Sequence, residues 1–231
     1  MRVAYALLIV TCLLFFGCSK SDPEATVAVV EQKTAVQVPT RPADARPIIA
    51  IFGDSLSEGL GADPGKSFPD FLQKALDTEG LAYRVVNLGI SGDTTTGGLG
   101  RINSAIELKP RMVVLELGGN DGLRGVPVAQ TSTNLELMIQ ALQKSEAQVV
   151  LAGMSLPPNY GPDYIRSFEK IYKNLAVRYH VTLIPFLLSD IARQIGSRPG
   201  LIQRDGIHPT AEGNEVVAHT VLTVIRPLLK N

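Results

Sequence analysis

Cysteine is nearly absent from this chain of 231 residues, and both cysteines, Cys12 and Cys18, lie near the N-terminus. The rest of the sequence has no thiol, which excludes a disulfide and a cysteine nucleophile from any downstream domain. Net charge is absent as well, because 22 Lys and Arg residues balance 22 Asp and Glu residues. Without a basic run that would bind phosphates, we expect no nucleic-acid partner.

The apolar run behind Arg2 is too short to span a bilayer. It covers residues 3–16, which is fourteen residues, whereas a membrane-spanning helix needs about 20. A short positive end followed by a short apolar run is typical of a secretory signal. We therefore expect residues 1–17 to form a signal peptide.

Cys18 follows Gly17 in the stretch LLFFGCSK. This stretch resembles the lipobox of bacterial lipoproteins, in which the cysteine becomes lipid-modified and N-terminal. Phe15 and Phe16 depart from the leucine and the small residue that are usual there, so ordinary signal cleavage and an uncleaved anchor remain alternatives. The resemblance implies a lipoprotein of the bacterial cell envelope, periplasmic or at the outer membrane and anchored through Cys18, with a soluble periplasmic or secreted form as the alternative.

Residues 18–47 contain scattered charge and several prolines but no helical period, which favours a linker ahead of one domain over residues 48–231. Within that domain, short apolar runs rich in β-branched residues alternate with helix-like stretches. The runs are 47–55, 84–89, 111–119, 147–154 and 181–186, and the helix-like stretches are 67–80, 131–147, 164–180 and 210–229. The sequence thus predicts an α/β fold with a parallel sheet covered by helices on both sides.

Ligands of such sheets bind beyond the carboxyl ends of the strands, so the residues that follow each run are the candidates for function. A phosphate-binding P-loop, G-x-x-x-x-G-K-[ST], does not occur anywhere in the sequence. Gly98 and Gly100 lack the third glycine of the dinucleotide motif G-x-G-x-x-G, and they follow the second strand rather than the first. The sequence therefore argues against a nucleotide-binding site.

Serine and histidine are the remaining candidates for chemistry. Ser55 ends the first strand, and Ser57 lies two residues further on. A serine hydroxyl attacks an acyl carbon well only when a base takes its proton, so a histidine must lie nearby. Of the three histidines in the chain, His180 falls at a helix end and His219 within the last amphipathic stretch. We expect these two histidines to have a structural role or to be solvent-exposed, without a part in catalysis.

The third histidine, His208, follows Asp205 at a spacing that lets the carboxylate reach Nδ1 while Nε2 faces outward. A cap at a helix start explains the same pattern equally well. Asp205 and His208 would also suit a metal ion, but no third ligand has a helpful spacing, so we expect neither a metal nor a cofactor.

The glycine-rich stretch VNLGISGDTTTGGLGRI, residues 86–102, fits the needs of a serine nucleophile. Such a nucleophile requires donors for the oxyanion that develops on the substrate. Gly92 brings a backbone N–H close to that atom with no Cβ in the way, Asn120 offers its side-chain amide, and Ser55 adds its own N–H. Plain turn chemistry remains the alternative for both glycine-containing segments.

Four segments, GDSL (53–56), NLGISGDTT (87–95), ELGGNDGLRG (116–125) and DGIHP (205–209), resemble the four blocks of the SGNH/GDSL hydrolases in order and spacing. The third segment, together with LPPNYG (156–161), is similar to the TesA-like branch of arylesterases, acyl-CoA thioesterases and lysophospholipases.

This resemblance implies a three-layer, flavodoxin-like fold with a five-stranded parallel sheet. It implies Ser55 as the nucleophile, His208 as the base and Asp205 as the residue that orients it. The oxyanion hole would comprise the N–H groups of Ser55 and Gly92 and the side chain of Asn120. Segments 122–125 and 155–164 would form walls of an acyl pocket.

Three functions therefore remain to be distinguished. The first is a hydrolase of hydrophobic acyl esters or thioesters, for which lysophospholipids or environmental esters would be the substrates outside the cytosol. The second is a carbohydrate acetylesterase of the same superfamily. The third is a non-catalytic lipid- or glycan-binding lipoprotein, against which Ser55, Asp205 and His208 argue.

Overall fold

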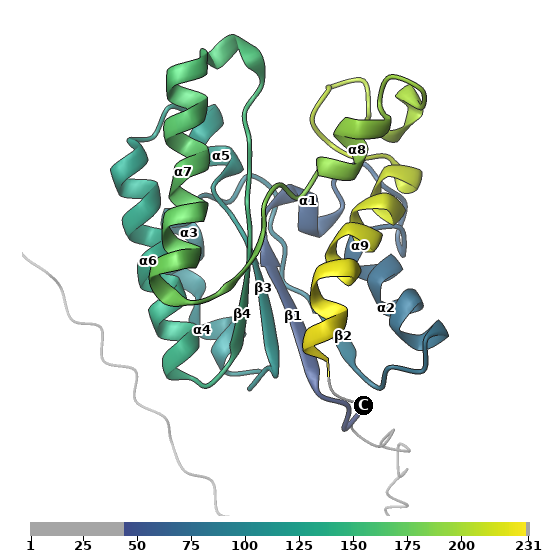
Figure 1. The fold of residues 1–231 in the computed structure, drawn as a ribbon. Helices are drawn as coiled ribbons and strands as arrows, with labels where there is room; N and C mark the ends of the chain where they lie inside the picture. The colour runs from purple at the N-terminus through teal and green to yellow at the C-terminus, as the bar shows by residue number, and fades with distance from the viewer. Residues whose placement is uncertain (1–43, 230–231) are drawn as a thin grey trace, which may run out of the picture. The chain divides into compact units, whose positions relative to one another are not determined.

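The computed structural model describes residues 44–229, so the predicted signal peptide, Cys18 and most of the predicted linker lie outside the described residues. All five predicted strands are present, and they form one parallel sheet in the order β2-β1-β3-β4-β5 (Figure 1). They are β1 (Ile48–Gly53), β2 (Arg84–Asn87), β3 (Met112–Glu116), β4 (Gln148–Ala152) and β5 (Thr182–Ile184). This order confirms the flavodoxin-like arrangement.

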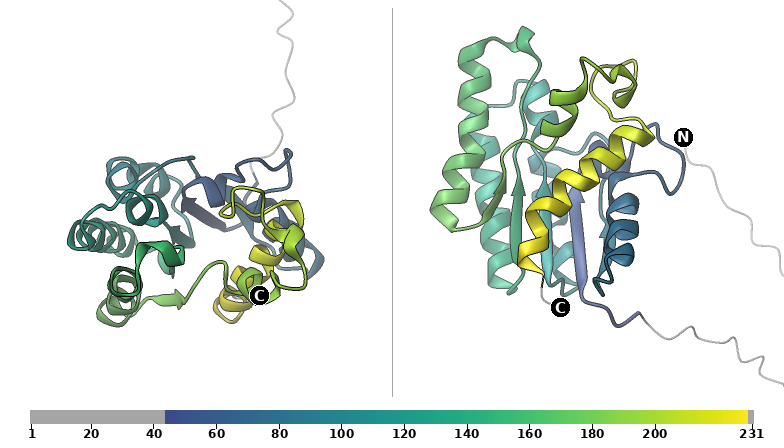
Figure 2. Two further views of the ribbon diagram at one scale, coloured as in Figure 1. Left: turned by 90° about the horizontal axis from the view of Figure 1, so that it is seen from above. Right: turned by 45° about the vertical axis from the view of Figure 1, so that its right-hand side comes forward.

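Helices cover both faces of the sheet (Figures 1 and 2). Helices α2 and α9 pack together on one face with α8 beside α9, whereas α3, α6 and α7 pack side by side on the other. The α-helices of the described residues are α1 (Ser55–Glu58), α2 (Phe68–Thr78), α3 (Thr95–Arg101), α4 (Asn103–Ile106), α5 (Gly119–Leu123), α6 (Val128–Lys144), α7 (Pro162–Tyr179), α8 (Ser189–Gln194) and α9 (Ala211–Ile225). Short 3₁₀ turns cover Pro158–Tyr160, Pro199–Leu201 and Arg226–Leu228.

Several helix boundaries differ from the sequence-based expectation, and proline accounts for two of them. Helix α6 begins at Val128 rather than at residue 131, because Pro127 has the non-helical ψ of 128° of an N-cap residue while its carbonyl accepts the N–H of Thr131 at 3.2 Å. Helix α9 ends at Ile225, because Pro227 lacks the N–H that would continue the α-helical ladder. A 3₁₀ turn follows in its place.

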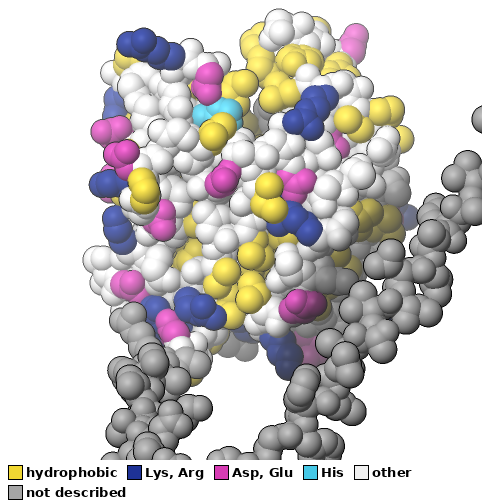
Figure 3. Space-filling model, turned by 180° about the vertical axis from the view of Figure 1, so that it is seen from behind, with side chains coloured by type: hydrophobic (Ala, Val, Ile, Leu, Met, Phe, Trp, Pro, Cys, Tyr) yellow, Lys and Arg dark blue, Asp and Glu magenta, His cyan; other side chains and the backbone are white. Residues whose placement is uncertain are grey.

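The central strands are the most deeply buried part of the described chain. Every residue of β3 is buried, and so are all residues of β1 after Ile48, which explains why these strands read as continuous apolar runs. Figure 3 shows the opposite side of the molecule, where acidic and basic side chains lie interspersed. Within residues 44–229, no helix combines the length and the apolar character that crossing a membrane requires.

Candidate active site

The candidate site lies at the carboxyl end of the sheet, where β1 and β3 are neighbours. The chain leaves β1 toward β2 on one side and leaves β3 toward β4 on the other, and this reversal opens a crevice in sheets of this kind. Gly53, the last residue of β1, pairs in register with Glu116, the last residue of β3. The segment that starts with Asp54 and the segment that starts with Leu117 therefore leave the sheet side by side.

Ser55 is the first residue of α1, a helix of only four residues, and is 8% exposed. Asp54 caps this helix, since its Oδ1 accepts a hydrogen bond of 3.0 Å from the backbone N–H of Leu56. Ser57, the other serine of the segment, is fully buried, and its hydroxyl donates to Glu116 Oε2 at 2.5 Å. Of the two serines, only Ser55 has a hydroxyl that faces a base.

That base is His208, although 153 residues separate it from Ser55 in the sequence. The distance from Ser55 Oγ to His208 Nε2 is 2.8 Å, and His208 Nδ1 lies 2.6 Å from Asp205 Oδ2. The other oxygen, Asp205 Oδ1, accepts hydrogen bonds of 2.9 and 3.0 Å from the backbone N–H groups of Ile207 and His208.

The protonation state of Asp205 fixes the tautomer of His208. Partial burial raises the pKa of Asp205, but hydrogen bonds from the His208 ring and from two backbone N–H groups outweigh it and lower this pKa to about 2. An ionised carboxylate only accepts, so the proton of the neutral imidazole sits on Nδ1. Nε2 is then the acceptor for the hydroxyl proton of Ser55, as a general base requires.

A residue that sequence reasoning missed, Gln203, holds the histidine loop against the serine loop. Its side-chain Nε2 donates to the carbonyl oxygens of Leu60 at 2.7 Å and Pro209 at 2.9 Å. Its backbone N–H donates to the carbonyl of His208 at 2.8 Å. No sequence motif marks this glutamine, because its partners lie in two separate loops.

The other two histidines lie outside this cluster. His180 is the C-cap residue of α7, in the left-handed conformation with φ 52°, and its N–H donates to the carbonyl of Ala176. His219 is an exposed residue of α9 whose Nδ1 lies 3.3 Å from Thr223 Oγ1. In residues 44–229, no three His, Cys, Asp or Glu side chains are grouped as a metal site would need.

Two backbone N–H groups at the site have no acceptor. Among the described residues, neither the N–H of Ser55 nor that of Gly92 has an assigned hydrogen-bond partner. Gly92 has φ +77°, a backbone conformation that side chains disfavour, which explains the glycine at this position. Unpaired donors near a serine hydroxyl that contacts a histidine are suited to binding an oxyanion.

The loop that carries Gly92 is held from two sides. Glu58, from the same short helix as Ser55, accepts hydrogen bonds from the backbone N–H of Ser91, at 2.8 Å, and from the Ser91 hydroxyl. Arg124, which follows α5, donates to the Gly92 carbonyl at 3.1 Å. These contacts fix the direction of the Gly92 N–H.

Asn120, the third expected donor, is occupied in this structure. Its Nδ2 donates to Asp54 Oδ2 at 3.1 Å and to the backbone carbonyl of Asp93 at 3.0 Å, which uses both of its hydrogens. The structure thus brings Asn120 to the site but directs its amide at protein acceptors. To bind a substrate oxygen, Asn120 must share or release one of these hydrogen bonds.

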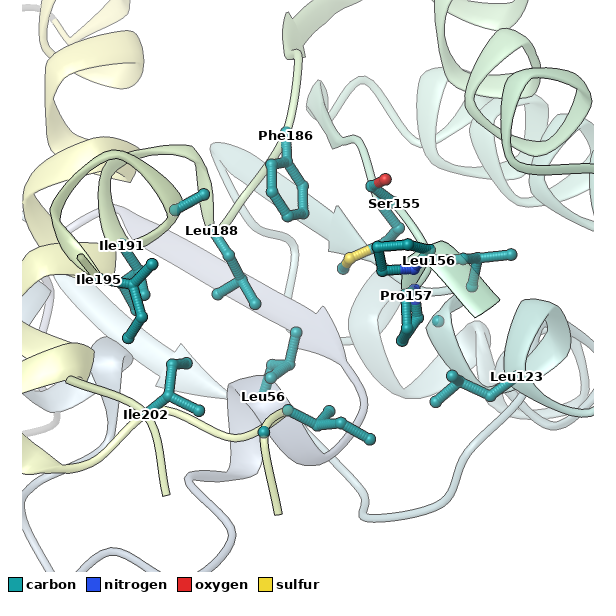
Figure 4. A pocket seen from close by; sticks show the side chains of 16 residues that line it. Leu56, Leu123, Ser155, Leu156, Pro157, Phe186, Leu188, Ile191, Ile195 and Ile202 are labelled. Atoms are coloured by element: carbon teal, nitrogen blue, oxygen red, sulfur yellow. The ribbon is translucent and has the colours of Figure 1, made fainter. Parts of the chain in front are cut away.

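Beside this cluster is an apolar cavity of about 400 Å³ (Figure 4). Leu56, next to the serine, and Ile207, next to the histidine, both line it. Of the expected walls, Leu123 and residues 155–158 line the cavity, whereas Tyr160 and Tyr164 hydrogen-bond to backbone carbonyls instead. A second wall was not predicted from the sequence, and its members are Phe186, Leu188, Ile191, Ala192, Ile195 and Ile202.

The chain is similar to several known hydrolases. A model of the GDSL-like lipase/acylhydrolase family matches residues 51–216. The chain is 44% identical over 182 residues to the esterase TesA of Pseudomonas aeruginosa, covering 78% of this chain and 89% of that protein. It is 35% identical over 184 residues to thioesterase 1/protease 1/lysophospholipase L1 of Escherichia coli K12, covering 79% and 85%. A crystal structure of TesA superimposes with a TM-score of 0.74 at 44% identity, covering 79% of this chain and 99% of that one.

The low pKa of Asp205 leads to a prediction about acid stability. Because the folded-state pKa is lowered from 3.8 to about 2, the stabilising contribution of Asp205 is present above about pH 4 and is lost as the pH falls through 2. We expect Asp205→Asn to lower the urea midpoint of unfolding at pH 7 and to have little effect near pH 2. Asp63→Asn, at an exposed position whose side chain has no assigned hydrogen bond or ion pair among the described residues, is the control. An equal effect of Asp205→Asn at both pH values would contradict the prediction.

Proposed function

Since the chain belongs to the GDSL-like lipase/acylhydrolase family and is a carboxylic ester hydrolase, we propose that it acts through an acyl-enzyme intermediate on Ser55. The observation that carries this proposal is the chain of contacts from Ser55 Oγ to His208 Nε2 and from His208 Nδ1 to Asp205. In this proposal Ser55 is the nucleophile, His208 the general base and acid, and Asp205 the residue that orients the imidazole.

The reaction would proceed in two acyl transfers. Ser55 Oγ attacks the substrate carbonyl carbon while His208 Nε2 takes its proton, and the carbonyl oxygen becomes an oxyanion. The oxyanion accepts hydrogen bonds from the unpaired N–H groups of Ser55 and Gly92. It also accepts one from Asn120 Nδ2 once that amide releases one of its protein acceptors. The alcohol or thiol then leaves with the proton from His208, and a water activated by the same nitrogen hydrolyses the acyl-serine.

We propose that the apolar cavity holds the acyl chain of the substrate. Its lining side chains are almost all aliphatic or aromatic, and a volume of about 400 Å³ is within the usual range for ligand sites. An enzyme restricted to acetyl groups would leave such a cavity empty, so the cavity favours esters of longer fatty acids over a carbohydrate acetylesterase. Lysophospholipids and aryl or alkyl esters are the substrate class that we propose.

We further propose that the protein works in the bacterial cell envelope, anchored by a lipid on Cys18. This part of the proposal rests on the sequence of residues 1–18 alone, because those residues lie outside the described structure. Outside the cytosol, lysophospholipids and exogenous esters are available as substrates, whereas acyl-CoA is not.

The role of Ser55 is tested by Ser55→Ala. We expect kcat on an aryl ester to fall by at least about a thousandfold, because no other group can form the acyl-enzyme. We also expect covalent labelling by a fluorophosphonate to disappear. Ser104→Ala, at an exposed position of α4, is the control and should keep both properties. Full turnover by Ser55→Ala would refute the assignment.

The acyl pocket is tested by filling it. Leu188 points into the cavity (Figure 4), so Leu188→Trp should exclude long acyl chains while acetyl esters still react. Each buried methylene is worth ~0.8 kcal/mol, or about fourfold in kcat/KM, so the wild type should improve steadily with chain length until the cavity is full. The measurement is kcat/KM across aryl esters from acetyl to palmitoyl.

The matched control for this series is Val177→Trp, since Val177 is 76% exposed on α7, away from the cavity. An unchanged chain-length profile in Leu188→Trp would place the acyl chain elsewhere. A wild type that prefers acetyl strictly would instead support the acetylesterase.

The anchor is tested by metabolic labelling with palmitate in cells that express the full chain. We expect incorporation that Cys18→Ser abolishes and that globomycin, an inhibitor of lipoprotein processing, prevents. Cys12→Ser serves as the control, because Cys12 lies within the apolar run. Equal labelling of Cys18→Ser and wild type, or no labelling of either, would refute lipidation at Cys18.

A further inference from the structure

Two carboxyl groups lie buried together behind the nucleophile, and the proposed reaction uses neither of them. Glu116, at the end of β3, is 0% exposed, and Asp54, directly before Ser55, is 2% exposed. Burying even one unpaired charge is costly, and two adjacent carboxylates repel each other as well. The pair is therefore stable only if it carries at least one proton.

Glu116 holds the backbone on both sides of Ser55. Its Oε2 accepts hydrogen bonds from the backbone N–H of Asp54 at 3.1 Å and from the hydroxyl of Ser57 at 2.5 Å. The fit is close, because a Cβ placed on Gly53 would lie 2.2 Å from the same oxygen. One carboxyl oxygen thus fixes the residue before the nucleophile and the residue two places after it.

The other oxygen, Glu116 Oε1, is buried and has no hydrogen-bond partner among the described residues if the group is a carboxylate. Asp54, in contrast, has donors for both oxygens: the N–H of Leu56 at Oδ1 and Asn120 Nδ2 at Oδ2. A proton on Glu116 turns its unpartnered oxygen from an unsatisfied acceptor into a donor. The hydrogen bonds therefore favour a neutral Glu116 beside an ionised Asp54.

The electrostatics agree with this distribution. Burial raises the pKa of Glu116 well above its usual range, and the charge of Asp54 raises it further. Burial also raises the pKa of Asp54, to about 6, although hydrogen bonds from Leu56, Glu116 and Asn120 oppose this effect. Of the two groups, Glu116 is the one that keeps the proton.

We propose that Glu116 is a positioning residue that stays a neutral acid: it holds both flanks of Ser55 and donates a hydrogen bond to the Asp54 carboxylate, whose charge in turn holds Asn120. The inference rests on the proposed function, because Ser55 and Asn120 are the groups it positions. Nothing in it requires Glu116 to touch the substrate.

The first test compares Glu116→Gln with Glu116→Leu. Glutamine keeps an acceptor for Asp54 and Ser57 and a donor for the Asp54 carboxylate, whereas leucine keeps neither. We expect kcat on an aryl ester within about threefold of wild type for Gln, and a fall of about 10- to 100-fold for Leu with a smaller change in KM, because misplaced oxyanion donors act on the transition state. Glu107→Gln and Glu107→Leu, at an exposed position after α4, are the controls.

The second test detects the proton directly and does not depend on turnover. In the Ser55→Ala background at neutral pH, infrared spectroscopy should show the C=O stretch of a buried protonated carboxyl group, and Glu116→Gln should remove that band. This measurement also decides the matter if Glu116→Leu fails to fold. Absence of the band, its persistence in Glu116→Gln, or a loss of kcat in Gln as large as in Leu would overturn the proposal. Failure of the proposed function would appear separately, as turnover by Ser55→Ala itself.

Discussion

The pairing of Gly53 with Glu116 at the ends of β1 and β3 is the constraint on which the site depends. Parallel pairing places both carboxyl ends at one edge of the sheet, so the turn that carries Ser55 and the turn that carries Asn120 start from adjoining residues. Neither turn needs a long loop to reach the other, and Asp54 connects them directly through Asn120 Nδ2. Only the histidine loop arrives from a distance, and Gln203 ties it to the serine loop.

The three proposed oxyanion donors are not equally free to bind a substrate oxygen. The N–H groups of Ser55 and Gly92 have no acceptor in the described structure, and their directions are set by α1 and by the contacts that hold the Gly92 loop. They are preorganised, so a developing oxyanion meets donors that need no rearrangement. Asn120 is tied to Asp54 and to the Asp93 carbonyl, and its contribution requires an exchange of partners. The strength of the hydrogen bond between Asn120 and Asp54 therefore affects how easily Asn120 can donate to the oxyanion.

Much of the fold was predictable from the sequence, because buried parallel strands give unbroken apolar runs and the longer helices give a clear period. The helices that were missed, such as α1 and α5, have four or five residues, too few to show a period. The four sequence blocks predicted which residues meet at the site, but contacts that join separate loops, such as those of Gln203, leave no local pattern. The same holds for the second wall of the cavity, which comes from the segment after β5. Glu116 did leave a signal, a single carboxyl residue in an otherwise apolar strand.

Why Glu116 is neutral rather than ionised follows from the charges of the proposed reaction. A second carboxylate behind Ser55 would repel the oxyanion that forms in front of it. As a general scale, two like unit charges about 8 Å apart repel each other by ~2 kcal/mol at an effective dielectric constant of about 20, which corresponds to roughly 30-fold in rate. A single charge on Asp54 is also unfavourable to the oxyanion, but it is attractive to the His208 imidazolium that forms in the same step, an interaction that contributes to the pKa of Asp54. Asp205 is ionised as well and already pairs with this imidazolium, so a further carboxylate at Glu116 would add repulsion without a new cationic partner. Protonation of Glu116 avoids that charge while preserving every hydrogen bond that holds the serine turn in place.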